Sequence, residues 1–324
     1  MSEILLTGAA GFIGAKVGEK LLEQGHKVLG LDDLNDYYDV RLKKWRLAQL
    51  QRFPEFTFRQ VDVADKESLN EALGDFSPQA IINLAARAGV RYSLENPFVY
   101  FHANCLGTLN LLEIARKNKI SKFILASTSS LYAGQKMPFS ETLPVNEPIS
   151  PYAASKKAAE VTCYTYHYLY NLDVTIFRYF TVYGPCGRPD MSIFRFITWL
   201  QKDQPLQLFG DGSQSRDFTY VDDIAEGTIR GLRLKGFQII NLGGNKPYAL
   251  SEAISLIEKE MGKITTIHQH DFHRADLKAT WADISRAKEL LGWQPTITLE
   301  EGIKKTVKWH LENYWWLREI RLNP

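Results

Sequence analysis

The chain has 324 residues, of which 45% are hydrophobic and 23% are charged. These fractions are typical of a soluble globular protein, and they exclude a disordered or fibrous chain. The formal net charge is only +2, which lacks the positive excess of a general nucleic-acid-binding protein, so we expect no nucleic-acid partner. The length favours one large domain with a smaller one, or a single elaborated α/β domain.

Cysteine content and the N-terminus bear on the compartment. Cys105, Cys163 and Cys186 are far apart and odd in number, which favours a reducing environment over a set of disulfides and gives no zinc pattern. The start of the chain has an acid at Glu3 and no signal-peptide pattern. No apolar run approaches the ~18 residues of a membrane span. We therefore expect a cytoplasmic protein with no membrane partner and no metal site.

In the first half of the chain, short apolar runs alternate with segments of helical spacing. The expected strands are residues 4–6, 27–31, 57–61, 80–84, 123–126 and 174–178. The expected helices are residues 13–24, 42–51, 66–73, 97–117 and 152–170, with starts at Asp65 and at Ser150 before Pro151. This alternation predicts an α/β protein with a Rossmann-type, doubly wound parallel sheet that is covered by helices on both faces.

The pattern changes after residue 178. Loops rich in Gly, Pro and Asp occupy residues 184–189, 210–215 and 241–247. The alternation partly resumes at residues 221–234 and 237–242. We therefore expect a Rossmann domain over residues 1–178, with parts of 217–245, and a smaller, interleaved α/β lobe over residues 179–324.

The turn after the first expected strand has a dinucleotide-binding pattern. Residues 7–14 read TGAAGFIG, and a helix pattern follows. Gly8 permits the tight turn, Gly11 lets the backbone approach a diphosphate, and Gly14 lets the helix pack close to the strand. The diphosphate would meet the free N–H groups at the start of this helix, around Phe12 and Ile13.

Acidic residues at the ends of the next two strands indicate which dinucleotide is bound. Asp32 lies 18 residues beyond Gly14, where a carboxylate accepts hydrogen bonds from the adenosine ribose. It would repel a 2′-phosphate, so NAD is favoured over NADP. Asp62 and Val63 follow the third strand, where an acid often contacts adenine, although Asp62 could instead belong to a helix cap.

Tyr152 and Lys156 lie four residues apart on one face of an expected helix. A phenol has an unperturbed pKa of ~10, and a nearby ammonium and a cationic cofactor favour the phenolate, so Tyr152 could act as an acid and base. Such a pair also arises by chance. Residues 127–132, STSSLY, add hydroxyls at the end of a strand, where open parallel sheets bind ligands, although they could be an ordinary polar strand end.

Together these motifs resemble the extended short-chain dehydrogenase/reductase superfamily, and within it the NAD-dependent nucleotide-sugar epimerases and dehydratases. Residues 83–86 (NLAA), 216–223 (RDFTYVDD) and 282–287 (ADISRA) extend the resemblance over essentially the whole chain. It implies Thr128, Tyr152 and Lys156 as a catalytic triad. It also implies cofactor contacts by Leu84, Ala85, Ala86, Asn104 and Tyr179, besides Tyr152 and Lys156.

Three strings narrow the resemblance to UDP-glucuronate 4-epimerases: residues 35–39 (NDYYD), 88–93 (AGVRYS) and 180–191 (FTVYGPCGRPDM). Similar sugar dehydratases have an Asp-Glu pair where this chain has Ser129 and Ser130, and similar UDP-glucuronate decarboxylases have Glu at the second position. The resemblance therefore implies a 4-epimerase that converts UDP-glucuronate to UDP-galacturonate through a 4-keto intermediate. A UDP-glucose/UDP-galactose 4-epimerase and a UDP-glucuronate decarboxylase remain alternatives, as do a reductase using free NAD(P)H and a non-catalytic scaffold.

Candidate substrate contacts follow from the same comparison. Oxidation at carbon 4 of a uronate creates a β-keto acid that loses carbon dioxide easily. A hydroxyl cradle could hold the carboxylate out of the reactive geometry, unless these hydroxyls bond only neighbouring backbone; its proposed members are Thr128, Ser129, Ser130 and Thr181. Arg188 and Arg216 are candidates for the diphosphate or for ordinary surface salt bridges.

The resemblance adds a nucleoside site and an assembly. It implies that Phe209 packs near uracil and that Asp276 contacts the uridine ribose, although Ala275 departs from the usual Gly. It also implies a homodimer through the helices at residues 97–117 and 152–170, and a place in polysaccharide biosynthesis.

Overall fold

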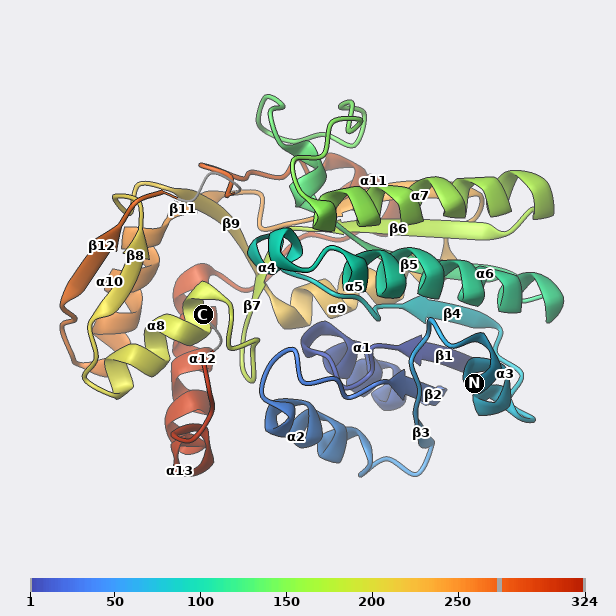
Figure 1. The fold of residues 1–324 in the computed structure, drawn as a ribbon, viewed down its shortest axis with the longest axis horizontal. Coiled ribbons are helices and arrows are strands. Elements are labelled where there is room, and N and C mark those ends of the chain that lie inside the picture. The colour runs from blue at the N-terminus through green and yellow to red at the C-terminus, as the bar shows by residue number, and fades with distance from the viewer. Residues whose placement is uncertain (1, 273–275, 323–324) are drawn as a thin grey trace.

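A seven-stranded parallel sheet forms the centre of the protein in a computed structural model that describes residues 2–272 and 276–322 (Figure 1). The strand order is β10-β6-β5-β4-β1-β2-β3, and each pair of neighbours is parallel. The strands are β1 (Glu3–Thr7), β2 (Lys27–Asp32), β3 (Phe56–Gln60), β4 (Ala80–Asn83), β5 (Lys122–Thr128), β6 (Asp173–Tyr179) and β10 (Phe237–Leu242). The doubly wound sheet predicted from the alternation is confirmed.

Helices cover both faces of this sheet, which explains why its inner strands are almost continuously apolar. One buried cluster joins the sheet to α1 (Phe12–Glu23), α2 (Val40–Leu50), α9 (Val221–Arg230) and α11 (Ser285–Leu291). A second cluster joins it to α3 (Lys66–Leu73), α6 (Gly107–Lys117) and α7 (Pro151–Tyr170). The predicted caps are present, since Asp65 and Ser150 each accept a hydrogen bond from a backbone N–H in the first turn.

The prediction of one continuous α-helix over residues 97–117 is wrong, because a π-helical segment interrupts it. The chain passes through α5 (Phe98–Tyr100) and a π-helical segment, η1 (Phe101–Leu106), before α6 begins. A π-helix places one additional residue in a turn, and such turns often lie at functional sites. Periodicity alone does not reveal this wider turn, because the flanking segments keep ordinary helical spacing.

The second lobe has its own apolar core around a three-stranded sheet and a two-stranded sheet. Its strands are β7 (Thr181–Tyr183), β8 (Leu206–Phe209), β9 (Ser215–Tyr220), β11 (Pro247–Ala249) and β12 (Ile267–His270), and its helices are α8 (Ser192–Gln201), α10 (Leu250–Met261), α12 (Leu299–Glu312) and α13 (Tyr314–Leu317). Shorter helices are α4 (Val90–Glu95), η2 (Ser129–Tyr132) and η3 (Gly231–Arg233). Between β9 and β11 the chain returns to the large sheet to add α9 and β10, so the lobes are interleaved.

Aromatic packing joins the C-terminal helices to the first lobe, where α13 approaches α2 (Figure 1). The ring centroid of Trp45 lies 5.3 Å from that of Trp309 and 6.4 Å from that of Trp316. Arg41 adds an ion pair with Glu319 at 3.0 Å. No helix in the described part of the chain is long and apolar enough to cross a membrane.

Candidate active site

A cavity of about 550 Å³ lies between the two lobes. One wall comes from the carboxyl ends of β1, β2, β4, β5 and β6, and the other comes from α8, β8 and β9. The sheet has its topological switch at β1, which pairs with β2 on one side and with β4 on the other. Ligands of open α/β sheets bind in the crevice that such a switch creates.

The glycine turn forms the floor of this cavity next to the switch. Gly8 has a φ of +69°, and a side chain there would collide with the backbone of Leu84 and Ala85 at the end of β4. A side chain at Gly14 would collide with the carbonyl oxygen of Gly8. The two glycines therefore allow α1 to begin close to the sheet, with Phe12 and Ile13 lining the cavity.

Asp32 ends β2 and lines the cavity with 7% of its surface exposed. Its carboxylate accepts hydrogen bonds from the N–H groups of Ala10, at 3.2 Å, and Leu34, at 2.9 Å. Lys43 of α2 lies 3.6 Å away. Burial raises the pKa of Asp32, and the Lys43 ammonium opposes that rise; its contact with a ribose remains a prediction.

The other predicted cofactor contacts mostly line the same cavity, and their roles remain predictions. Asp62 is half-exposed, accepts a hydrogen bond from the Ala64 N–H at 2.9 Å, and lies 3.2 Å from His102. The remaining lining residues of this group are Val63, Leu84, Ala85, Ala86 and Tyr179. The Tyr179 hydroxyl forms a 2.8 Å hydrogen bond with Thr228 of α9, which leaves its ring as the surface that faces a ligand.

Asn104 is not among the residues that line the cavity, and the cofactor contact predicted for it remains a prediction. It is 1% exposed in the π-helical segment. Its amide nitrogen donates to the Arg87 carbonyl, at 3.0 Å, and to the Ser155 hydroxyl, at 2.9 Å, while its oxygen accepts from the Arg87 N–H at 2.9 Å. These partners use its hydrogen-bonding groups, and Asn104 instead fastens the loop after β4 to α7.

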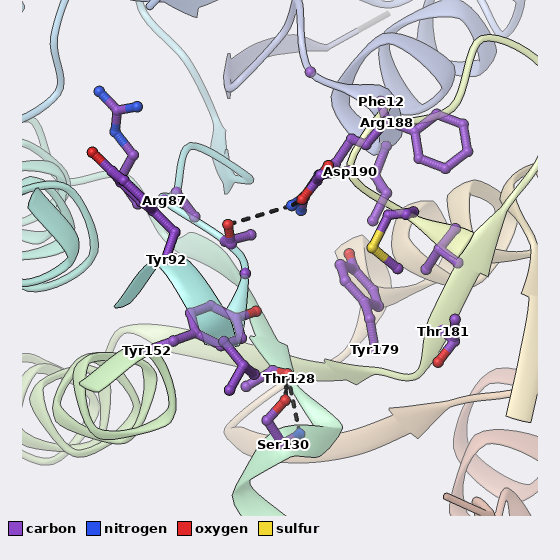
Figure 2. A pocket seen from close by; sticks show the side chains of 18 of the residues that line it. Phe12, Arg87, Tyr92, Thr128, Ser130, Tyr152, Tyr179, Thr181, Arg188 and Asp190 are labelled. Carbon is purple, nitrogen blue, oxygen red and sulfur yellow. Dashed lines mark hydrogen bonds and ion pairs between the residues drawn. The ribbon is translucent and has the colours of Figure 1, made fainter. Parts of the chain in front are cut away.

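Tyr152 and Lys156 both reach the cavity from α7. The Lys156 ammonium donates to the carbonyl of Ala126 on β5 at 3.0 Å, and burial lowers its pKa to about 8. Tyr152 points into the cavity beside Thr128 (Figure 2). Burial raises the pKa of Tyr152, whereas its hydrogen bond with Thr128 and the Arg188 cation act in the opposite direction.

The four predicted cradle hydroxyls all line this cavity. Thr128 donates to the Ser130 hydroxyl at 3.1 Å and accepts from the Ser130 N–H at 3.1 Å. Figure 2 shows Thr128 and Ser130 together, with Thr181 across the cavity from Tyr152. The hydroxyls thus belong to one site, although Thr128 also serves the neighbouring backbone, and their contact with a carboxylate remains a prediction.

The two arginines predicted for the diphosphate have different surroundings. Arg188 pairs with Asp190 and is close enough to Tyr152 to lower the pKa of the phenol. Arg216 is affected by Asp276 and Arg91 instead. Arg188 therefore lies on the side of Tyr152, and Arg216 lies on the side of the predicted nucleoside site.

Two cations of this nucleoside region were missed by the sequence reasoning. Arg91 of α4 forms an ion pair with Asp276 at 2.7 Å, and its guanidinium lies 4.1 Å from the centre of the Phe209 ring. Arg195 of α8 is half-buried, and its buried Nε has no hydrogen-bond partner within the described ranges. Burial and the nearby Arg91 cation lower the pKa of both Arg195 and Arg216.

The arrangement of these cations favours an anionic ligand. Arg91, Arg195 and Arg216 share one end of the cavity, with Asp276 to balance them in part. Guanidinium groups bind phosphate oxygens with two parallel hydrogen bonds. Arg91 lies in the string AGVRYS, which narrowed the resemblance but gave Arg91 no role. Arg195 lies within an ordinary amphipathic helix pattern, which carries no signal for a ligand. Ala275, whose departure from Gly was noted, lies outside the described residues.

The residues present fit a dinucleotide. Gly8 and Gly14 have no side chain, and one would collide with neighbouring backbone at either position. Helix α1 begins at the cavity. Asp32 offers a carboxylate beside the glycine turn, where it accepts a hydrogen bond from the Ala10 N–H. The adenosine end would lie by β2, and the reacting end would lie by Tyr152.

We predict that Gly14→Ala abolishes dinucleotide retention, because the new methyl group would force α1 away from the Gly8 carbonyl. The purified variant would contain at least about tenfold less bound dinucleotide than the wild type, measured by release and chromatography. Glu23→Ala is the control, since Glu23 is exposed at the far end of the same helix α1. Full retention in Gly14→Ala would contradict this account of the turn.

Comparisons with known proteins agree with this geometry. A family model described as GDP-mannose 4,6 dehydratase matches residues 5–306. A UDP-glucuronate 4-epimerase of Thermodesulfobacterium geofontis is 54% identical over 99% of this chain and 100% of its own length.

Solved structures give the same result. The UDP-glucuronic acid 4-epimerase of Bacillus cereus in complex with UDP-glucuronic acid and NAD is 37% identical, with a TM-score of 0.90 over 96% of this chain and 99% of that chain. The UDP-glucose 4-epimerase of Thermotoga maritima with UDP-glucose is 29% identical, with a TM-score of 0.89 over the same shares. The chain therefore belongs to the GDP-mannose 4,6 dehydratase family of extended short-chain dehydrogenases/reductases.

Proposed function

We propose that the protein is an NAD-dependent UDP-glucuronate 4-epimerase, an isomerase that interconverts UDP-glucuronate and UDP-galacturonate. One observation carries this proposal: Tyr152 and Lys156 share a cavity with four hydroxyls, and Ser129 and Ser130 stand where similar dehydratases have acids. The 54% identical relative with this activity supports it, as does the structural similarity to an epimerase that binds UDP-glucuronic acid and NAD.

Proton transfer at carbon 4 is the task of α7. Tyr152 removes the proton of the 4-hydroxyl and later returns it, while Thr128 holds the phenol by their hydrogen bond. Lys156 supplies positive charge beside the phenolate. NAD, held by the glycine turn and Asp32, would supply a hydride acceptor and donor for carbon 4, so the reaction has no net redox change.

The hydroxyl cradle protects the intermediate. The 4-keto uronate loses carbon dioxide fastest when the bond to the carboxylate lies perpendicular to the ketone plane. Hydroxyls from η2 and from Thr181 of β7 hold the carboxylate from two sides of the cavity and keep that bond out of the perpendicular geometry. They also bind the anion without burying a counter-charge against it.

The nucleotide half of the substrate lies in the second lobe. Arg216 and Arg91 contact the diphosphate, Phe209 packs near uracil, and Asp276 contacts the ribose. Arg195 lines the same end of the cavity and has an unpaired Nε to offer the anion. We also propose a division into an NAD-binding domain, residues 1–178 with parts of 217–245, and a nucleotide-sugar lobe, residues 179–324. The protein acts in the cytoplasm, in polysaccharide biosynthesis.

The deciding experiment incubates the purified protein with UDP-glucuronate and no added cofactor, and identifies the products by proton NMR. We expect UDP-galacturonate, because retained NAD is regenerated in each turnover. UDP-pentose with carbon dioxide would make the protein a decarboxylase. Turnover of UDP-glucose alone would make it a neutral-sugar epimerase. This is the second candidate function, and the similar UDP-glucose 4-epimerase structure has the same fold.

We predict that Thr181→Asn raises the share of decarboxylated UDP-pentose among the products about tenfold. The reason is the loss of roughly 1.4 kcal/mol of orienting interaction with the carboxylate. Thr57→Asn, at an exposed position of β3, is the control and keeps the wild-type product ratio. The same ratio in Thr181→Asn would remove this residue from the cradle.

We propose that the protein forms a homodimer through α6 and α7. One face of these two helices packs into the monomer core, where Leu111, Leu112 and Tyr166 are buried. The exposed apolar face instead comprises Phe98, Phe101, Leu106, Leu109, Val161, Tyr164, Tyr168, Leu169 and Tyr170. Exposed apolar side chains on α5, η1, α6 and α7 suit the same surface of a second copy.

Sedimentation analysis tests this interface. Tyr168 is 73% exposed, and Tyr168→Glu would place a charge within the apolar contact. We expect this variant to sediment as a monomer and the wild type as a dimer. Trp315→Glu is the control, because Trp315 is 72% exposed but lies on α13. A dimer that survives in Tyr168→Glu would place the interface elsewhere.

A further inference from the structure

A buried ion pair lies behind the catalytic residues. Arg178 of β6 and Glu160 of α7 each have 2% of their side chain exposed. Their contact is bidentate, with Nε donating to Oε1 at 2.9 Å and a terminal nitrogen donating to Oε2 at 2.8 Å. Neither residue is among those lining the cavity. Burying such a pair costs desolvation energy, so packed apolar residues would often serve stability equally well.

The pair belongs to a row of polar side chains across three strands. Arg178 stands between Ser127 of β5 and Asn241 of β10 in the sheet register. The Ser127 hydroxyl donates to Glu160 at 2.6 Å. Arg178 donates to the Tyr132 hydroxyl at 2.9 Å, which donates to Asn241 at 2.8 Å. Each polar group is thus satisfied only when α7, η2 and the three strands keep one arrangement.

This row touches the catalytic segment at two places. Ser127 directly precedes Thr128 in the chain, and Glu160 lies one helical turn after Lys156. Lys156 itself donates to the carbonyl of Ala126. Helix α7 is therefore fastened to β5 twice, by Lys156 at Ala126 and by Glu160 at Ser127.

We infer that Glu160 and Arg178 are positioning residues for the epimerisation: their ion pair, closed by Ser127, holds α7 against β5 so that Tyr152 meets Thr128. This inference rests on the proposed function. Stability alone does not require this ion pair. Positioning does, because a small sliding of α7 along β5 would separate the Tyr152 phenol from the Thr128 hydroxyl. Misplacement by about 1 Å can cost on the order of 100-fold in rate.

Glu160 also contributes charge to the site. Burial lowers the pKa of Lys156 to about 8, whereas Glu160 acts to raise it. The other titratable groups that act on Lys156 are Cys105 of η1 and Cys163 of α7, and both act in the same direction as Glu160. Removal of the Glu160 charge therefore lowers the pKa of Lys156, and the ammonium is lost at a lower pH.

Three variants of the full-length, NAD-containing protein separate position from charge. Glu160→Gln keeps the length of the side chain and removes its charge. Glu160→Asp keeps the charge and withdraws the carboxylate by one methylene. Ser127→Ala removes one hydrogen bond and leaves the ion pair intact, so it remains informative where a Glu160 variant fails to fold. Glu226→Gln is the matched control, since Glu226 pairs with Arg230 on the surface of α9.

For each variant, kcat, KM and the pH profile are measured with UDP-glucuronate, together with bound NAD. We expect the alkaline limb of the pH–rate profile of Glu160→Gln to move to lower pH by about one unit, because the Lys156 ammonium is lost at a lower pH. We expect kcat of Glu160→Asp to fall about 10- to 100-fold with KM little changed and the alkaline limb in place. We expect kcat of Ser127→Ala to fall about tenfold, and Glu226→Gln to match the wild type.

The inference is overturned where Glu160→Gln keeps the wild-type alkaline limb, or where Glu160→Asp and Ser127→Ala keep the wild-type kcat. A wild type that is inactive with UDP-glucuronate contradicts the proposed function instead. The variants are then compared with the wild type on UDP-glucose, so the two claims are decided separately.

Discussion

The close contact between the turn at Gly8–Gly14 and the end of β4 sets where ligands can lie. Without side chains at Gly8 and Gly14, α1 starts against the sheet, at the switch between β1 and β4. The helix N-terminus and its free N–H groups then face the crevice. Asp32 enters from β2 on one side of that crevice, and Thr128 enters from β5 on the other. A bulkier turn would displace α1 and separate these groups.

Electrostatic character changes along the cavity. Near β5 the ligand would meet hydroxyls, a phenol whose pKa is raised by burial, and the Arg188 cation, which is itself paired with Asp190. Near β8 and β9 it would meet Arg91, Arg195 and Arg216. Burial and the Arg91 cation lower the pKa of Arg195 and Arg216, and like charges held this close favour an anion between them. A ligand with a diphosphate at one end and a uronic acid at the other matches this sequence of surfaces.

Several side chains near the cavity act on its shape without facing it. Asn104 holds the loop after β4 to α7, and Glu160 holds α7 to β5 through Ser127. The π-helical turn that carries Asn104 places it within reach of both segments. The reacting groups therefore depend on polar contacts that lie one layer behind them, in a region where unpaired groups would be costly.

The amino-acid sequence by itself determined the parallel sheet, the glycine turn, Asp32 and the Tyr152–Lys156 pair. Each of these is a local pattern: apolar runs, a three-residue glycine spacing, or two residues one helical turn apart. Only the tertiary structure decided that Arg195 reaches the site, that Arg188 and Arg216 separate, that Asn104 turns inward, and that Trp45 packs on Trp309 and Trp316. These contacts join segments far apart in the chain, so their partners are fixed by the packing of the two lobes, which no local spacing records.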